Sequence, residues 1–314
     1  MKNKQKKFFV YLTILTTLLF MLSSCGAGGK MSEEGYKITN VKIYKDTPAW
    51  ELAQAVQKEN AGKIETIARE HPELIDFKDP VHGVTLLFWS VGTEKYKSVE
   101  ALLKVGVDPD ILSGPAGCTA LFLAAGFSFV DNQAKKDPKY VKLLLEYGAD
   151  PNINCIGVDE SITPEPGSSP LMESIGCGIE KTKALIEAGA DINYKTQSGR
   201  TAAIDALLIA CANTVFEEKQ YAYYLIVEKR AIISNPYHHI SPNSDPDENY
   251  YPVDMLSRWI PKLGSEEYKI KMEIVDEFNR QGVDYWSNKN IPNSTLENIK
   301  KLYPDTWEEY IKLY

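Results

Sequence analysis

Three stretches of this chain repeat nearly the same letters: "LLKVGVDPD" (residues 102–110), "LLLEYGADPN" (143–152) and "LIEAGADIN" (185–193). Each copy has an apolar pair, a few variable positions, a glycine, a small residue and an aspartate. A line that recurs in this way is typical of a chain built from stacked structural repeats, in which each unit buries its apolar face against the next one.

A second recurring line, a threonine or serine followed by small and apolar residues, precedes the first. Threonine or serine at a helix N-cap accepts a hydrogen bond from an otherwise unpaired amide, and proline suits the next position. Apolar residues at helical spacing then predict a second helix, which ends where glycine adopts a left-handed conformation. The copies are Thr47-Pro48-Ala49-Trp50, Thr85-Leu86-Leu87-Phe88, Thr119-Ala120-Leu121-Phe122, Ser169-Pro170-Leu171-Met172, Thr201-Ala202-Ala203-Ile204 and the degenerate Tyr251-Pro252-Val253-Asp254.

A unit of cap, helix, helix, glycine and turn resembles the ankyrin repeat. The resemblance implies an all-α ankyrin-repeat solenoid over residues 41–288, with five well-defined repeats, a degenerate sixth, and short turn or hairpin fingers. Two features depart from the family pattern: its opening histidine is absent from every copy, and Arg230 stands in the glycine place in "YLIVEKRA" (224–231). We expect residues 289–314 to form a C-terminal helical cap, with Leu296, Ile299 and Leu302 on one face.

The first 40 residues have the pattern of an export signal and a tether. Four lysines and an apolar run at 8–22 precede Leu22-Ser23-Ser24-Cys25. About 15 apolar residues fall short of the ~18–20 that span a bilayer, which disfavours a transmembrane anchor. The ending resembles the bacterial lipobox, which implies a signal peptide at 1–24, lipidation of Cys25, and a lipidated flexible tether at 25–40. The implied location is an exported, membrane-anchored lipoprotein, on the outer membrane facing the periplasm in a Gram-negative source.

Net charge limits the partners. Without residues 1–24 the chain keeps 31 basic and 43 acidic side chains, a formal charge of −12. Nucleic-acid binders need a basic surface that displaces counterions, so we expect no nucleic-acid partner. We expect membrane contact only through the N-terminal acyl chains.

Four insertions stretch the repeats. Two lie between the helices of a repeat, at 127–136 and 213–220, and two lengthen the fingers, at 156–167 and 235–250. Insertions in repeat proteins are often on the binding side, although longer loops are also tolerated at small cost. The long fingers are rich in acids, which favours a basic protein partner. The predicted partner-binding residues are Asp159, Glu160, Glu165, Asp245, Asp247 and Glu248.

Residues that could carry chemistry are few. His238 and His239 lie near acidic residues in "DPDEN" (245–249), but neither metal-ligand spacing nor a calcium-loop pattern is present. We therefore predict no metal, no cofactor and no enzymatic activity. Export would permit disulfides, but the sequence leaves the pairing of the remaining cysteines open, with Cys118–Cys155 as one possibility. The other two cysteines, Cys177 and Cys211, fall in apolar helical segments.

These features predict a non-enzymatic scaffold in the cell envelope that binds a protein partner through its concave face and extended fingers. Similarity to exported lipoproteins of this kind implies an immunity or antagonist protein for a secreted toxin. The alternative is an envelope-maintenance scaffold that positions a periplasmic enzyme, such as a peroxide-removing enzyme. A third interpretation, that the chain is itself an enzyme, has no motif behind it.

Overall fold

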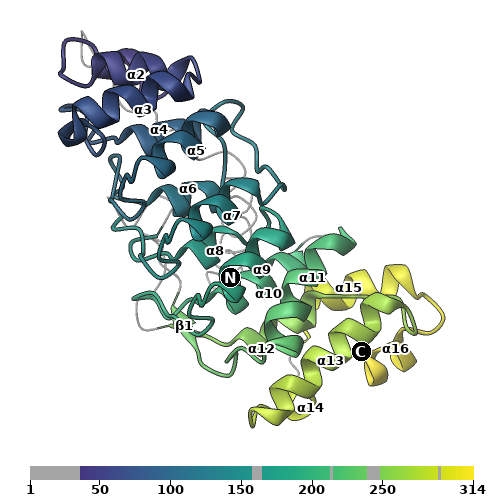
Figure 1. Cartoon of the computed structure of the whole chain (residues 1–314). Helices are drawn as coiled ribbons and strands as arrows, with labels where there is room; N and C mark the ends of the chain where they lie inside the picture. The colour runs from purple at the N-terminus through teal and green to yellow at the C-terminus, as the bar shows by residue number, and fades with distance from the viewer. Residues whose placement is uncertain (1–35, 158–164, 213–214, 239–247, 289–290) are drawn as a thin grey trace. The chain divides into compact units, whose positions relative to one another are not determined.

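The computed structural model describes residues 36–157, 165–212, 215–238, 248–288 and 291–314 (Figure 1). It forms two compact units, one up to residue 170 and one over residues 171–314. None of the helices in these residues is long and apolar enough to cross a membrane. The predicted signal peptide and Cys25 lie outside the described residues.

The first unit consists of helix pairs arranged in two layers. First helices contact first helices (α2 with α4, α4 with α6), and second helices contact second helices (α3 with α5, α5 with α7) (Figure 1). This stacking confirms the all-α ankyrin-type solenoid. The elements are η1 (Val41–Tyr44), α2 (Trp50–Gln57), α3 (Ala61–Glu70), η2 (Pro72–Leu74), α4 (Leu86–Gly92), α5 (Tyr96–Lys104), α6 (Ala120–Ala125) and α7 (Lys139–Glu146).

The second unit continues the pairs and ends in shorter helices. The repeat elements are α8 (Pro170–Glu173), α9 (Ile179–Glu187), α10 (Ala202–Ala212), η3 (Phe216–Glu218), α11 (Lys219–Ala222), the π-helical η4 (Tyr223–Glu228), α12 (Pro252–Met255), η5 (Leu256–Arg258) and α13 (Glu266–Arg280). A two-stranded ribbon, β1 (Tyr237–His238) and β2 (Asn249–Tyr250), forms part of one finger. The chain then forms α14 (Tyr285–Asn288), α15 (Asn293–Leu302) and α16 (Trp307–Leu313).

The two recurring lines of sequence have the local roles expected of them. The Oγ1 atoms of Thr85, Thr119 and Thr201 accept hydrogen bonds from amides three residues later, at 3.1–3.2 Å. The expectation for Thr47 was wrong. Its hydroxyl donates to the carbonyl of Tyr44 instead, and α2 begins at Trp50 without a side-chain cap.

The glycines of the repeated line end the second helices in left-handed conformation. Gly106, Gly148, Gly189 and Gly282 have φ values of 91°, 88°, 94° and 84°. The next amide then reaches back into the last helical turn, as when the amide of Ala149 donates to the carbonyl of Leu144. This geometry pairs carbonyl groups that the helix end would leave unpaired.

The insertion at 127–136 folds back onto the preceding repeat. The amide of Phe129 donates to the carbonyl of Gly92, and its ring lies so close that a Cβ at position 92 would be 2.2 Å from it. Lys135 and the hydroxyl of Ser128 both contact the carboxylate of Glu94. This insertion therefore packs against its own solenoid, and only glycine fits at position 92.

The long finger at 156–167 is fastened at its base to the finger before it. A disulfide joins Cys118 to Cys155, both buried, with Cα atoms 4.3 Å apart. The amides of Ile156 and Gly157 donate to the carbonyls of Gly117 and Ala116. The pairing that the sequence left open is thus Cys118–Cys155, while Cys177 and Cys211 are free thiols.

The C-terminal helices pack through aromatic residues. Ile299, Tyr310 and Tyr314 form a buried cluster, and the hydroxyl of Tyr310 donates to the carbonyl of Pro261 at 2.6 Å. The ammonium of the fully buried Lys271 lies 3.5 Å from the centroid of the Tyr314 ring.

Two of the three residues expected on one face of α15 follow that expectation. Ile299 is fully buried and Leu296 is half-buried, but Leu302 is 60% exposed. Leu302 is the last residue of α15, and the chain leaves the helix at Tyr303. At this end of the helix the side chain of Leu302 is no longer covered. The apolar pattern alone could not locate this helix end.

Loss of the disulfide should weaken the fold measurably. The bond closes a loop of 37 residues in sequence separation. Restricting an unfolded loop of this size stabilises the folded state by about 4 kcal/mol. We expect the double variant Cys118→Ala/Cys155→Ala to lose free energy of unfolding of this order in urea titrations. As a control, unfolded residues 30–314 should show two titratable thiols before reduction and four after it; four at the outset would contradict the bond.

Candidate interaction site

The aspartate of the repeated line organises its own turn. The Oδ1 atoms of Asp108, Asp150 and Asp191 each accept a hydrogen bond from the amide two residues later, at 2.8–2.9 Å. Short side chains of this kind replace a backbone partner in turns. The Gly-x-Asp sequence therefore ends a helix and begins a turn in which the aspartate pairs an amide of its own turn.

A second set of hydrogen bonds connects these turns from repeat to repeat; we call it the turn ladder. In the first unit, the Oδ1 of Asp76 accepts from the amide of Asp108, and that of Asp110 from the amide of Asp150. In the second unit, the Oδ1 of Asn193 accepts from the amide of Ile232. Burial raises the pKa of Asp76 and Asp110 above the usual value, since the ladder holds both carboxyls partly out of water.

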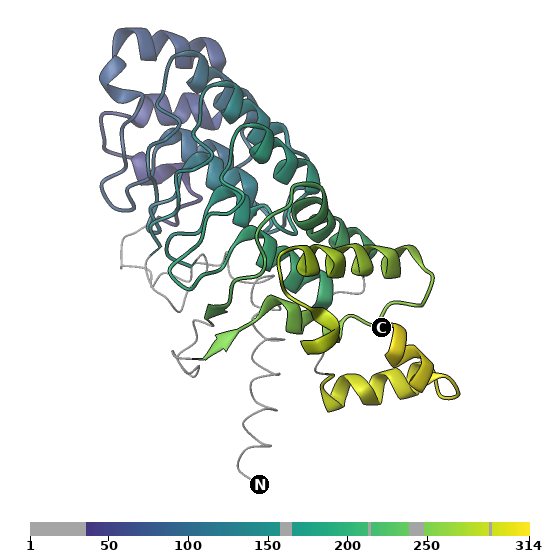
Figure 2. The ribbon, with the colours of Figure 1, turned by 90° about the horizontal axis from the view of Figure 1, so that it is seen from below.

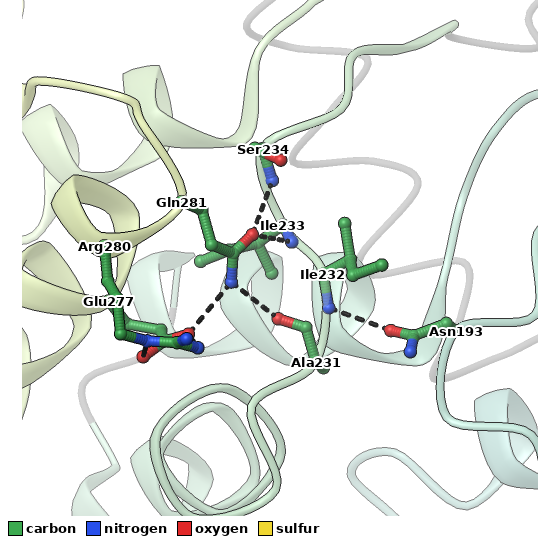
Figure 3. Close-up of polar contacts among 8 residues, drawn as sticks. All are labelled: Asn193, Ala231, Ile232, Ile233, Ser234, Glu277, Arg280 and Gln281. Carbon is green, nitrogen blue, oxygen red and sulfur yellow. Dashed lines mark hydrogen bonds and ion pairs between the residues drawn. The ribbon is translucent and has the colours of Figure 1, made fainter.

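The turn ladder changes at residues 230–234, where the line reads Arg-Ala-Ile-Ile-Ser. Gln281 substitutes for the missing acids (Figure 3). Its Oε1 accepts from the amides of Ile233 and Ser234 at 2.9 and 3.2 Å, and its Nε2 donates to the carbonyl of Ala231 at 3.0 Å. Sequence reasoning missed Gln281. The signal that could have found it is the loss of the turn aspartate at Ile232, which needs a replacement acceptor.

Arg230 takes the glycine place in conformation as well as in sequence. Its φ is 56°, in the left-handed region that glycine tolerates best. The preceding segment, η4, is π-helical, so the amide of Ala231 reaches the carbonyl of Leu225 six residues back. A π-turn is often found at functional positions.

A shallow cleft of about 260 Å³ lies beside Arg230, between η4 and α13. Glu277 lies at one side of it, 7% exposed. Burial would raise the pKa of Glu277, but hydrogen bonds from Arg280 and Gln281 and the nearby arginine charges outweigh burial and lower that pKa. Its carboxylate is therefore ionised and fully engaged. The cleft is lined by Val227, Arg230, Glu273, Asp276, Glu277 and Arg280.

The second long finger is anchored by the β1–β2 ribbon. Tyr237 pairs with Tyr250 and His238 with Asn249, and Figure 2 shows the two strands side by side. The amide of His238 donates to the carbonyl of Ser198 at 2.7 Å, which fixes the ribbon to the preceding finger.

The predicted partner-binding acids are only partly placed by the structure. Asp159, Glu160, Asp245 and Asp247 lie outside the described residues. Glu248 is exposed, and its carboxylate accepts from the hydroxyl of Tyr250 at 3.0 Å.

Glu165 does not lie on the surface as expected. It is 8% exposed and belongs to the base of the finger, where its carbonyl accepts from the amide of Ser168. The finger returns to the solenoid two residues later, and this return takes Glu165 inward. The pattern of acids in the sequence could not distinguish the base of the finger from its tip.

Inside the second unit, several ionisable groups are perturbed by burial. The half-buried Glu173 has its pKa raised to about 7 by burial, aided by the charge of Asp205 and opposed by that of Lys181. Burial raises the pKa of the Cys211 thiol to about 12, and it lowers the pKa of Lys219. A thiol with so high a pKa stays protonated and unreactive.

These perturbed groups do not line the cleft described above. Over the parts of the chain that the structure describes, no three or more His, Cys, Asp or Glu side chains are grouped to hold a metal ion. The local chemistry is that of polar recognition.

Comparison with known proteins agrees with this architecture. The ankyrin repeat family model matches residues 116–155, the repeat that the disulfide encloses. Protein PhlB of Serratia liquefaciens is 34% identical over 119 residues, which cover 38% of this chain and 45% of PhlB. The putative ankyrin repeat protein L91 of Acanthamoeba polyphaga mimivirus is 33% identical over 113 residues, 33% of this chain and 16% of that protein. The chain spans less than half the length of either relative, and these matches support an ankyrin-repeat protein.

Glu173 should make stability depend on pH. Because its pKa is raised from 4.5 to about 7 in the folded state, its contribution to stability is fully present below pH 4.5 and is lost as pH rises from there through 7. We expect Glu173→Gln to gain free energy of unfolding relative to wild type as pH rises from 5 to 8. Urea titrations at several pH values measure this difference. The exposed Glu180→Gln serves as the control and should show no such trend; parallel curves for Glu173→Gln and wild type would contradict the prediction.

Proposed function

We propose that this chain is a membrane-tethered scaffold that binds a basic protein partner through its first helices and its two long fingers. The observation that carries the proposal is the construction of the finger bases. One is held to the preceding finger by the Cys118–Cys155 disulfide, and the other is closed by the β1–β2 ribbon. Fixed bases reduce the entropy that a loop loses when it binds, which favours a role in recognition.

The disulfide also supports export. Structural disulfides form and persist in oxidising compartments and are rare in the cytosol. A buried disulfide in a chain whose first 25 residues resemble a lipoprotein signal fits a protein that folds outside the cytoplasm. On this basis we propose lipidation at Cys25 and attachment to the envelope by acyl chains.

A non-enzymatic role suits the site chemistry. The perturbed groups Glu173, Cys211 and Lys219 do not converge on the cleft beside Arg230. Ankyrin repeats commonly act as rigid binding surfaces, and the proposed acidic fingers complement a positively charged partner.

Two roles would use the same surface. An antagonist of a secreted toxin must hold its target without transforming it, which a rigid acidic surface can do. An envelope-maintenance scaffold would instead position a periplasmic enzyme, such as a peroxide-removing one. The activity of the bound partner separates them, since an antagonist inhibits its partner and a positioning scaffold leaves it active.

The finger proposal predicts a charge-dependent loss of binding. Two charge-reversal variants test this, Asp159→Lys/Glu160→Lys and Asp245→Lys/Asp247→Lys/Glu248→Lys. Each should lower the affinity for a basic envelope partner at least tenfold, because like charges would then face each other. The measurement is affinity capture with residues 30–314, followed by binding assays at two salt concentrations. Deleting the whole of 156–167 is a poorer test, because it also removes the finger base.

The matched control for this experiment reverses acids elsewhere. Glu308→Lys/Glu309→Lys changes exposed charges on α16 and should leave affinity and salt dependence unchanged. Glu165→Gln should act through stability rather than affinity, since Glu165 is buried. Partner binding that survives both finger variants would rule out the acidic fingers as the contact.

Lipidation has a separate test. Replacement Cys25→Ser removes the thiol that would carry the acyl chain, so the protein should move from the membrane to the soluble envelope fraction. Fractionation with metabolic lipid labelling measures both effects. Unchanged membrane attachment of the Cys25→Ser protein would argue for a transmembrane segment instead.

A further inference from the structure

Arg230 occupies a position where the backbone conformation favours glycine. At the equivalent Gly106, Gly148 and Gly189 a Cβ would meet no atom within 4 Å, so backbone conformation alone favours glycine there. A side chain with left-handed φ costs free energy relative to glycine. Within the described parts of the chain, the exposed Arg230 guanidinium makes no hydrogen bond or ion pair, although its charge lowers the pKa of Glu277.

The opposite wall of the cleft is a stripe along α13. Glu273, Asp276, Glu277 and Arg280 repeat at three- and four-residue spacing, so they share one face of the helix. The stripe is acidic toward Glu273 and basic at Arg280, and its ends are about 10 Å apart at 1.5 Å rise per residue.

Most of the charges in the stripe already have partners. Arg280 Nε donates to Glu277 at 2.7 Å, Gln281 Nε2 donates to Glu277 at 3.0 Å, and Tyr223 donates to Glu273 at 3.1 Å. The exposed carboxylate of Asp276 makes no hydrogen bond or ion pair within the described residues. Counting only partners among the described residues, the cleft therefore offers one unpaired cation, Arg230, and one unpaired anion, Asp276.

From this arrangement we infer that the cleft is a second binding site, and that it takes a protein segment with an acidic side chain for Arg230 and a basic one for Asp276. A guanidinium binds a carboxylate in a two-pronged geometry that a lysine cannot reproduce. Val227 in the cleft and Ile232, 42% exposed beside Arg230 in the chain, provide apolar contact for the stems of such side chains. Glu273, Asp276 and Glu277 repel phosphate groups, so the occupant is a mixed-charge peptide and not a nucleic acid.

This site is independent of the proposed finger surface. It is lined by η4, Arg230 and α13, whereas the predicted finger acids lie further along the loops that join the second helix of one repeat to the first helix of the next. Failure of the finger variants would leave this inference untouched, and the reverse also holds.

The first arm of the test measures stability in the full chain. If Arg230 is kept for binding, Arg230→Gly should raise the urea midpoint because the left-handed strain is relieved. The control, Gly148→Arg, places the same side chain in another glycine position with open space around it and should lower the midpoint. A lower midpoint for Arg230→Gly would show a structural role and overturn the inference.

The second arm measures binding with a defined probe. The probe is a fluorescently labelled, acetylated and amidated helical peptide with Glu and Lys four residues apart. Its binding is measured by fluorescence anisotropy. Wild type should bind it two- to fivefold more tightly than the peptides in which Gln replaces Glu or Lys. Arg230→Gly should remove the preference for Glu and Asp276→Asn the preference for Lys, while Arg230→Lys should only partly preserve the former. No binding, or equal affinity for all three peptides, would overturn the inference.

Discussion

Every inter-repeat turn must pair backbone groups that two helix ends leave exposed, and the rest of the structure depends on how this is done. A left-handed residue turns the chain, an aspartate pairs its own turn, and a second acid or amide pairs the turn of the next repeat. These hydrogen bonds lie in exposed turns, so each contributes only modestly to stability, and together they link each turn to the next repeat. The recurring glycine and aspartate of the sequence provide this hydrogen bonding, and the apolar faces of the helices pack between the repeats.

The same constraint explains why the fifth repeat can differ without losing its fold. Once Gln281 pairs the turn at Ile233 and Ser234, the aspartate of the repeated line is no longer required, and Ile232 and Arg230 are free to face outward. The loss of the turn aspartate at Ile232 is therefore compensated by Gln281, 49 positions further along the chain. Arg230 and Asp276, which line one cleft, thus lie where the repeat departs from the common sequence pattern.

Much of the fold could be predicted because it is specified locally. Threonine caps, helical spacing and glycine at helix ends act within a few residues, so the helix pairs and the left-handed glycines follow from the sequence. Contacts between distant residues could not be predicted: Gln281 with the 231–234 turn, Phe129 over Gly92, and the choice of Cys155 for Cys118. The residues of the candidate site were the least predictable. Glu165 and Glu248 look alike in sequence and differ only in where the finger turns inward. The predictions for Thr47 and Leu302 were wrong for a related reason. A short motif does not reveal which of several nearby residues begins or ends a helix.

If the chain is tethered and binds a partner as proposed, the disulfide also has a mechanical consequence. Tension along the chain bypasses everything between Cys118 and Cys155, because the covalent bond carries the force across the base of the repeat. The 37 residues of that loop cannot extend, which removes about 130 Å from the length available to a stretched chain. The third repeat would thus keep its shape under a load that unravels its neighbours, and the finger that begins at Cys155 would stay attached to a structured base.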